Sequence, residues 1–155
     1  GLGETDRDLV EMFHILKSEQ VAAYLFSFNP EPGTKMENTP RVPIVRTRRI
    51  QLVKNLIEDH GLPESAVKFN ESEAISRIDA PRELLERVEN SGVAFMTDGC
   101  PDRRGEMACN RPYGSYRPGE EFRDYPFLPR TEDLEVIRDE MKLPEVAGPE
   151  ETTLA

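Results

Sequence analysis

The chain begins with the stretch Gly1-Leu2-Gly3-Glu4-Thr5, in which two glycines lead directly into an acidic, amphipathic segment. Thr5 can accept a hydrogen bond at a helix N-terminus, and Asp6 and Asp8 favour the positive end of the helix dipole. The apolar residues that follow recur at helical spacing. We therefore expect a strand end to meet a helix here. Because methionine does not come first, we also expect this point to lie in the middle of a domain.

Working outward, the remaining pattern predicts short strands that alternate with helices. Such an order requires crossover helices between parallel strands, and three strands are too few to close a barrel. The predicted fold class is therefore α/β, as half of a (β/α) barrel or a small open sheet. We expect strands at 21–28, 66–69 and 93–97, helices at 44–60, 81–91 and 131–142, half-barrel units over 1–97, a Cys-, Gly- and Arg-rich loop at 98–130, and a flexible tail at 143–155.

Composition limits the classes of partner. The 155 residues carry a net charge of −10, which disfavours nucleic acid and anionic membranes as partners. The basic cluster Arg46, Arg48 and Arg49 is interpreted as a solvated helix face, because one charged turn is ordinary. No apolar run is long enough to cross a bilayer. Two cysteines do not form a secreted disulfide framework, so a cytoplasmic location is expected.

The opening motif resembles the strand-end segment of biotin synthase and related radical S-adenosylmethionine enzymes. A second motif, Phe28-Asn29-Pro30-Glu31-Pro32-Gly33-Thr34, resembles the Asn-Pro-x-Pro-Gly-Thr loop of the same family. The resemblance implies the C-terminal part of a TIM-type barrel of parallel strands, with ligands at the strand ends. It also implies that Gly1, Gly3, Glu4 and Asn29 line the S-adenosylmethionine and substrate side of the cavity. Plain turn chemistry remains the alternative at both motifs.

Two departures from the family pattern restrict this interpretation. The Cys-x-x-x-Cys-x-x-Cys motif, which holds the radical-generating 4Fe-4S cluster, is absent from residues 1–155 and is expected upstream of Gly1. The chain by itself is therefore not expected to cleave S-adenosylmethionine. The stretch 67–73 also lacks the arginine that serves a second cluster in biotin synthases, so biotin is not the expected product.

Cys100 and Cys109 are the candidate metal ligands. Eight residues separate them in a glycine-rich loop, and thiolates are the usual ligands of iron–sulfur clusters. An auxiliary cluster would need further ligands from outside the chain. A reversible disulfide, a zinc site completed elsewhere and two unrelated thiols remain alternatives, although the spacing is not that of a usual zinc module. Nearby, Arg111 and Tyr113 are candidates for substrate binding, since arginine can hold a carboxylate or phosphate and tyrosine can form a cavity wall.

The leading hypothesis is thus the C-terminal portion of a biotin synthase-related radical enzyme. By analogy it would insert sulfur as lipoyl synthase does. Its expected partners are a small-molecule or acyl-carrier substrate and a reductant such as ferredoxin or flavodoxin. A second hypothesis is a non-catalytic iron–sulfur or zinc-binding partner subunit, and a third is a small α/β domain whose cysteines are merely structural.

Overall fold

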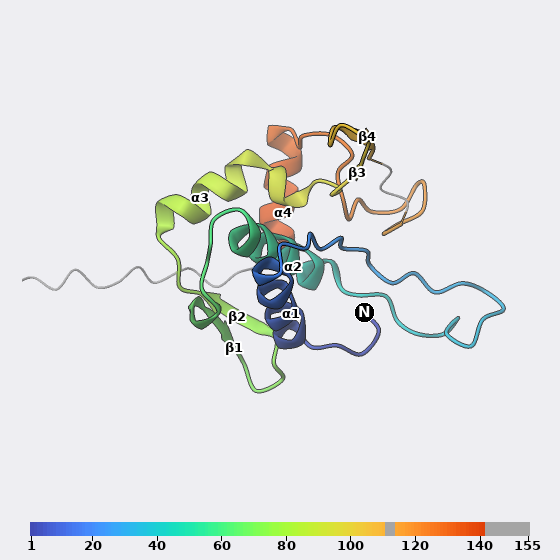
Figure 1. The fold of residues 1–155 in the computed structure, drawn as a ribbon. Coiled ribbons are helices and arrows are strands. Elements are labelled where there is room, and N and C mark those ends of the chain that lie inside the picture. The colour runs from blue at the N-terminus through green and yellow to red at the C-terminus, as the bar shows by residue number, and fades with distance from the viewer. Residues whose placement is uncertain (111–113, 142–155) are drawn as a thin grey trace, which may run out of the picture.

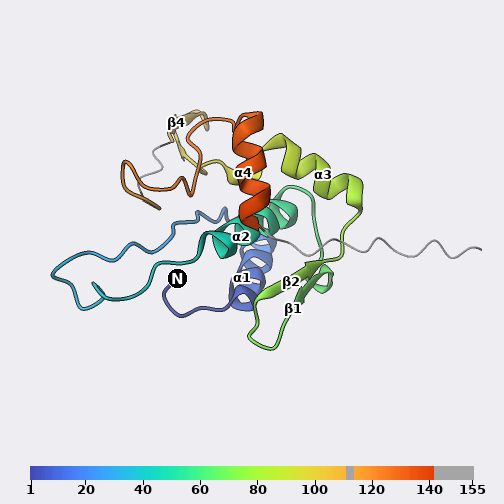
Figure 2. The same ribbon diagram turned by 180° about the vertical axis from the view of Figure 1, so that it is seen from behind.

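The computed structural model describes residues 1–110 and 114–141 (Figure 1). Three helices are stacked, with α2 (Ile44–Glu58) between α1 (Asp6–Ser18) on one side and α4 (Thr131–Met141) on the other. The two opposite views agree on this order (Figures 1 and 2). The remaining elements are α3 (Arg82–Ser91), β1 (Val67–Phe69), β2 (Ile75–Ile78), β3 (Cys100–Pro101), β4 (Met107–Cys109) and the single 3-10 turns Glu64–Ala66 and Val93–Phe95.

The first helix forms for the reason that its sequence predicts. Thr5 caps it, because the Thr5 hydroxyl accepts from the Asp8 N–H at 3.1 Å and the Asp8 carboxylate accepts from the Thr5 N–H at 2.7 Å. Val10 and Phe13 then lie one helical turn apart on the face that packs against α2. The helices expected near 44–60, 81–91 and 131–142 are also present, within a residue or two at each end.

The second helix lies at the centre of the core. Leu52, Val53, Leu56 and Ile57 are completely buried, and they pack with apolar residues of the other three helices and of the β1–β2 hairpin. Arg48, in the same helix, is also completely buried. The interpretation of Arg46, Arg48 and Arg49 as a solvated helix face is therefore wrong. Loop carbonyls and a carboxylate from α4 surround the Arg48 guanidinium group. The other two arginines are partly buried and donate to the backbone carbonyls of Glu4 and Met141.

The predicted half-barrel of parallel strands is wrong. Both sheets in the described residues are two-stranded and antiparallel, with Val67 opposite Ile78 in one and Cys100 opposite Cys109 in the other. The strand expected at 66–69 is present as β1, and a tight turn leads from it directly into β2. The Asn70 side chain closes this turn by accepting from the N–H groups of Ser72 and Ala74. A local antiparallel hairpin thus replaces the expected parallel pairing, although the helix expected at 81–91 follows it as α3.

The other two expected strands belong to no sheet in the described residues. The segment 21–28 is extended but belongs to neither sheet, and the long loop after it extends away from the helices (Figures 1 and 2). In place of a strand at 93–97, the turn Val93–Phe95 is followed by one isolated parallel bridge between Met96 and Tyr125. The expected tail at 143–155 lies outside the described residues. Among the described helices, none has the length and apolar character needed to span a bilayer.

Candidate functional site

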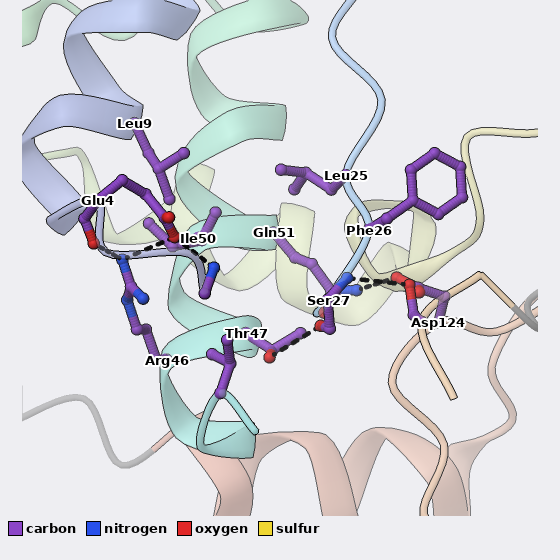
Figure 3. A pocket seen from close by; sticks show the side chains of 13 residues that line it. Glu4, Leu9, Leu25, Phe26, Ser27, Arg46, Thr47, Ile50, Gln51 and Asp124 are labelled. Atoms are coloured by element: carbon purple, nitrogen blue, oxygen red, sulfur yellow. Dashed lines mark hydrogen bonds and ion pairs between the residues drawn. The ribbon is translucent and has the colours of Figure 1, made fainter. Parts of the chain in front are cut away.

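Three adjoining cavities lie where the extended segment 21–28 crosses α2. Their volumes are ≈ 90, ≈ 270 and ≈ 200 Å³, and Leu25 and Asp124 line all three. Figure 3 shows the first of them, in which Gln51 and Asp124 are joined by a hydrogen bond beside the extended segment. Each is smaller than the volume of about 300 Å³ at which typical small-molecule sites begin, but the shared Leu25 and Asp124 place all three side by side. This region is the candidate functional site.

The extended segment is held over the cavities by side chains rather than by a neighbouring strand. The N–H of Ala23 donates to Glu58 at 3.3 Å, that of Leu25 to Asp98 at 3.1 Å, and that of Ser27 to the Ser115 hydroxyl at 3.4 Å. Alternate N–H groups of an extended chain point to the same side. The three side chains therefore accept hydrogen bonds from the N–H groups along one edge of the segment. Tyr24 and Phe26, between them, are 44% and 65% exposed.

Asp124 is the most deeply buried carboxyl group of the site. Gln51 donates to it at 2.7 Å and also to the backbone carbonyl of Arg123 at 2.8 Å. Burial raises the pKa of Asp124 above its usual range, and the hydrogen bonds from Ser115 and Gln51 offset this only in part. Asp124 can therefore keep a proton at a higher pH than an exposed aspartate, as a proton donor or as a hydrogen-bond donor to a ligand.

Lys54 supplies the positive charge of the second cavity. Its ammonium group lies 2.7 Å from Glu58 and 2.8 Å from Asp98. Burial by itself would lower the pKa of Lys54, but the hydrogen bonds from Lys54 to Asp98 and Glu58 outweigh it and raise that pKa. Because Asp98 and Glu58 also hold the backbone of the extended segment, this ion-pair cluster fixes the segment to α2.

At the other end of the site, Arg46 joins the opening motif to α2. Its guanidinium group contacts Asp6 at 2.6 Å. It also contacts the carboxylate and carbonyl of Glu4 at 3.3 and 2.7 Å (Figure 3). The Glu4 carboxylate also accepts from the N–H of Leu2 at 2.8 Å. Glu4 therefore places a carboxylate, held by Arg46, on the wall of the first cavity.

The structure brings together only part of the predicted S-adenosylmethionine site. Gly1 and Glu4 line the first cavity with Ser27. Gly3 adopts a left-handed conformation, with φ of 118°, and lines none of the three cavities. Asn29 is also outside them, and its amide donates to the Gly114 carbonyl at 3.3 Å. The substrate candidates Arg111 and Tyr113 lie outside the described residues.

The two predicted metal ligands are neighbours. Cys100 in β3 faces Cys109 in β4, both are free and exposed, and both line the third cavity. Across residues 1–110 and 114–141, no group of three or more His, Cys, Asp or Glu side chains could hold a metal ion. A zinc ion or an iron–sulfur cluster normally takes four protein ligands in a closed site, so this pair supplies half of such a set.

Sequence analysis missed the polar residues that shape the second cavity. Gln51, Lys54, Asn55 and Glu58 recur at helical spacing and line that cavity from one face of α2. This spacing is visible in the sequence, but a polar helix face is usually solvated. Asp98 and Asp124 carried no comparable signal, because they lie in irregular segments that only the folded chain brings to α2.

Comparison of the chain with protein-family models, with curated proteins and with solved structures gave no match.

Proposed function

We propose that the chain is the C-terminal portion of a biotin synthase-related radical S-adenosylmethionine enzyme. In this proposal, the residues described above position a ligand, and the radical-generating cluster is held outside the chain. Sulfur insertion, a small-molecule or acyl-carrier substrate, a ferredoxin or flavodoxin reductant and a cytoplasmic location belong to the same proposal. The barrel of parallel strands does not belong to it.

The observation that carries this proposal is the proximity of the two motifs on which the resemblance rests. A side chain added at Gly1 would place its Cβ 3.4 Å from the Cβ of Phe28, where the second motif begins. Phe26 and Ser27, which lead into that motif, line one cavity with Gly1 and Glu4. Segments that jointly bind one ligand must meet in this way, although they lie more than twenty residues apart in the sequence.

Residues 1–110 and 114–141 do not by themselves fit S-adenosylmethionine. The first cavity, at ≈ 90 Å³, is well below the size of about 300 Å³ at which small-molecule sites begin, and S-adenosylmethionine joins a nucleoside to an amino acid. The charged groups beside it, Glu4 and Arg46, already pair with each other. No reaction step is therefore assigned to the cofactor on this chain, whose proposed part is one wall of a larger site.

Two experiments test the proposal. The coding sequence upstream of Gly1 is expected to continue in frame into Cys-x-x-x-Cys-x-x-Cys. The enzyme that contains both parts, assayed anaerobically for 5′-deoxyadenosine, is expected to lose about tenfold or more in apparent affinity for S-adenosylmethionine on Glu4→Gln, because a hydrogen bond to a charged group contributes about 1.5–3 kcal/mol. Glu11→Gln, on the exposed face of α1, is the matched control. An upstream frame without the motif, or equal affinities for the two variants, would overturn the proposal.

The paired cysteines favour a second candidate, a non-catalytic iron–sulfur or zinc-binding partner subunit. Because both thiols are exposed on one hairpin, a second chain can reach them with the missing ligands. This candidate predicts that a complex with such a partner, loaded anaerobically with iron and sulfide or with zinc, loses bound metal in Cys100→Ala and in Cys109→Ala. Unchanged metal content in both variants would exclude it.

A further inference from the structure

We infer that Cys100 and Cys109 form a redox-active dithiol, which closes reversibly to an intramolecular disulfide on the surface hairpin. The inference does not depend on the enzyme class proposed above, because it uses only the geometry and exposure of the hairpin. It assigns to the pair a covalent modification that needs no ligand from another chain.

The pairing register already meets the geometric requirement for a disulfide. Cys100 and Cys109 are direct partners in the antiparallel β3–β4 ladder, and the ladder has a register irregularity only after this pair, between Cys100 and Pro101. Directly opposed residues in such ladders have Cα atoms about 4.5 or 5.5 Å apart, and disulfides join residues whose Cα atoms lie about 4.4–6.8 Å apart. Their side chains also project from the same face of the hairpin, because opposed residues share a face. The bond can therefore form without a change of register.

The hairpin holds this register by interactions that do not involve sulfur. At its tip, the Asp102 carboxylate accepts from the N–H groups of Arg104 and Glu106 at 2.7 and 3.1 Å, and Gly105 takes the left-handed conformation that the turn requires, with φ of 82°. At its base, the Thr97 hydroxyl donates to the Asn110 carbonyl at 3.3 Å. Each thiol is thus kept beside the other, which favours the intramolecular bond over bonds to a second molecule.

Both thiols are exposed, so an external disulfide can reach them. In the proposed reaction with glutathione disulfide, the thiolate of one cysteine attacks a glutathione sulfur and releases one glutathione thiolate. The thiolate of the other cysteine then attacks the protein sulfur of the mixed disulfide and releases the second. The dithiol loses two electrons and two protons, and glutathione disulfide is reduced to two glutathione molecules. Excess glutathione reverses both steps.

Oxidation would also alter the candidate site. Cys100 and Cys109 line the third cavity together with Leu25, Asp98 and Asp124. A disulfide replaces two rotatable thiols with one fixed bridge in that wall, and therefore reduces the freedom of the cavity's outer edge. The redox state of the hairpin is in this way coupled to the region where the three cavities adjoin.

The test uses the whole chain, equilibrated anaerobically over a series of glutathione to glutathione disulfide ratios. Free thiols are then alkylated under denaturing conditions, and the intact mass is measured. The wild-type chain is expected to change from a doubly alkylated form to a form lighter by two hydrogens that takes up no alkylating agent. Trypsin cleaves after Arg103 and Arg104, so the oxidised chain should yield two peptides joined by a reducible bond.

Cys100→Ser and Cys109→Ser are the matched variants, since serine keeps the size of these exposed side chains. Each retains one thiol, so each is expected to stop at the mixed disulfide with glutathione. The inference is overturned if the wild-type chain stays reduced at every ratio, accumulates the same glutathione adducts as the variants, or links to a second chain. Peptide mapping of the wild-type chain decides the matter even if a variant folds poorly.

Discussion

Replacing Arg48 by methionine should be among the most destabilising single changes in this chain. The guanidinium group has an exposure of 0% and donates to four acceptors. These acceptors are Glu140 at 2.7 Å, the Gln51 side chain at 3.0 Å, and the backbone carbonyls of Phe122 and Arg123, each at 2.6 Å. Arg48 therefore ties the loop before α4, and α4 itself, to the central helix.

The expected loss follows from what the substitution leaves behind. Methionine fills much of the same volume, but Glu140 remains as a largely buried charge without its partner, the Phe122 carbonyl loses the guanidinium donor, and the Arg123 carbonyl keeps only Gln51. Breaking a buried ion pair on one side costs about 3–5 kcal/mol. With a urea dependence of about 2 kcal/mol per molar, the unfolding midpoint should fall by roughly 1.5–2.5 M.

The assay is equilibrium urea unfolding at pH 7, followed by far-UV circular dichroism. Arg77→Met is the control, because Arg77 pairs with Asp79 at 2.6 Å on the surface, where such pairs contribute about 0–1 kcal/mol. The double variant Arg48→Met, Glu140→Met should regain part of the loss, since it removes the unpaired charge. If Arg48→Met costs no more than the control, then Arg48 does not hold the loop and α4 to α2 as described.

Three further predictions concern single groups. Burial raises the pKa of Asp124, so the native state holds its proton more tightly than the unfolded chain, and stability is lost as pH rises through the raised pKa. Asp124→Asn should therefore gain stability over the wild type above about pH 4, and a urea midpoint difference that does not grow with pH would contradict this. Thr5→Ala removes the cap of α1 and should cost about 1 kcal/mol in thermal unfolding, whereas Ser18→Ala at the other end should cost less. Gly92→Ala should cost more than about 1 kcal/mol by urea unfolding, because Gly92 ends α3 with φ of 72° and an added Cβ would lie 3.0 Å from Pro129; a neutral effect would place this strain elsewhere.

Local signals in the sequence predicted the helices correctly. The cap at Thr5 and the apolar spacing along α1 act within a few residues, so the sequence carries them directly. The same reasoning predicted a buried strand at 21–28 from its short apolar pattern, and this was wrong: the segment belongs to neither sheet, and Val21 and Phe26 are more than half exposed. The reason is that pairing between strands and burial depend on residues far away in the chain.

The sequence predicted some residues of the candidate site and missed others, for the same reason. The sequence indicated Gly1 and Glu4, and these do line a cavity, while the two cysteines lie side by side as any shared role requires. Whether they bind S-adenosylmethionine or a cluster stays a prediction. Lys54, Asp98 and Asp124 were missed, since in the sequence they are ordinary charged residues.

By itself, then, the sequence determined where helices begin and end, which residues are apolar enough to form the core, and that thiols and glycines gather at 99–109. Only the tertiary structure decided that the strands are local antiparallel hairpins, that Arg48 is buried, and that α2 and an extended segment enclose the candidate site. The physical reason is that capping and periodicity depend on neighbours a few residues apart. Burial of a charge and pairing of a strand depend on partners from distant parts of the chain, and only the folded chain brings those partners together.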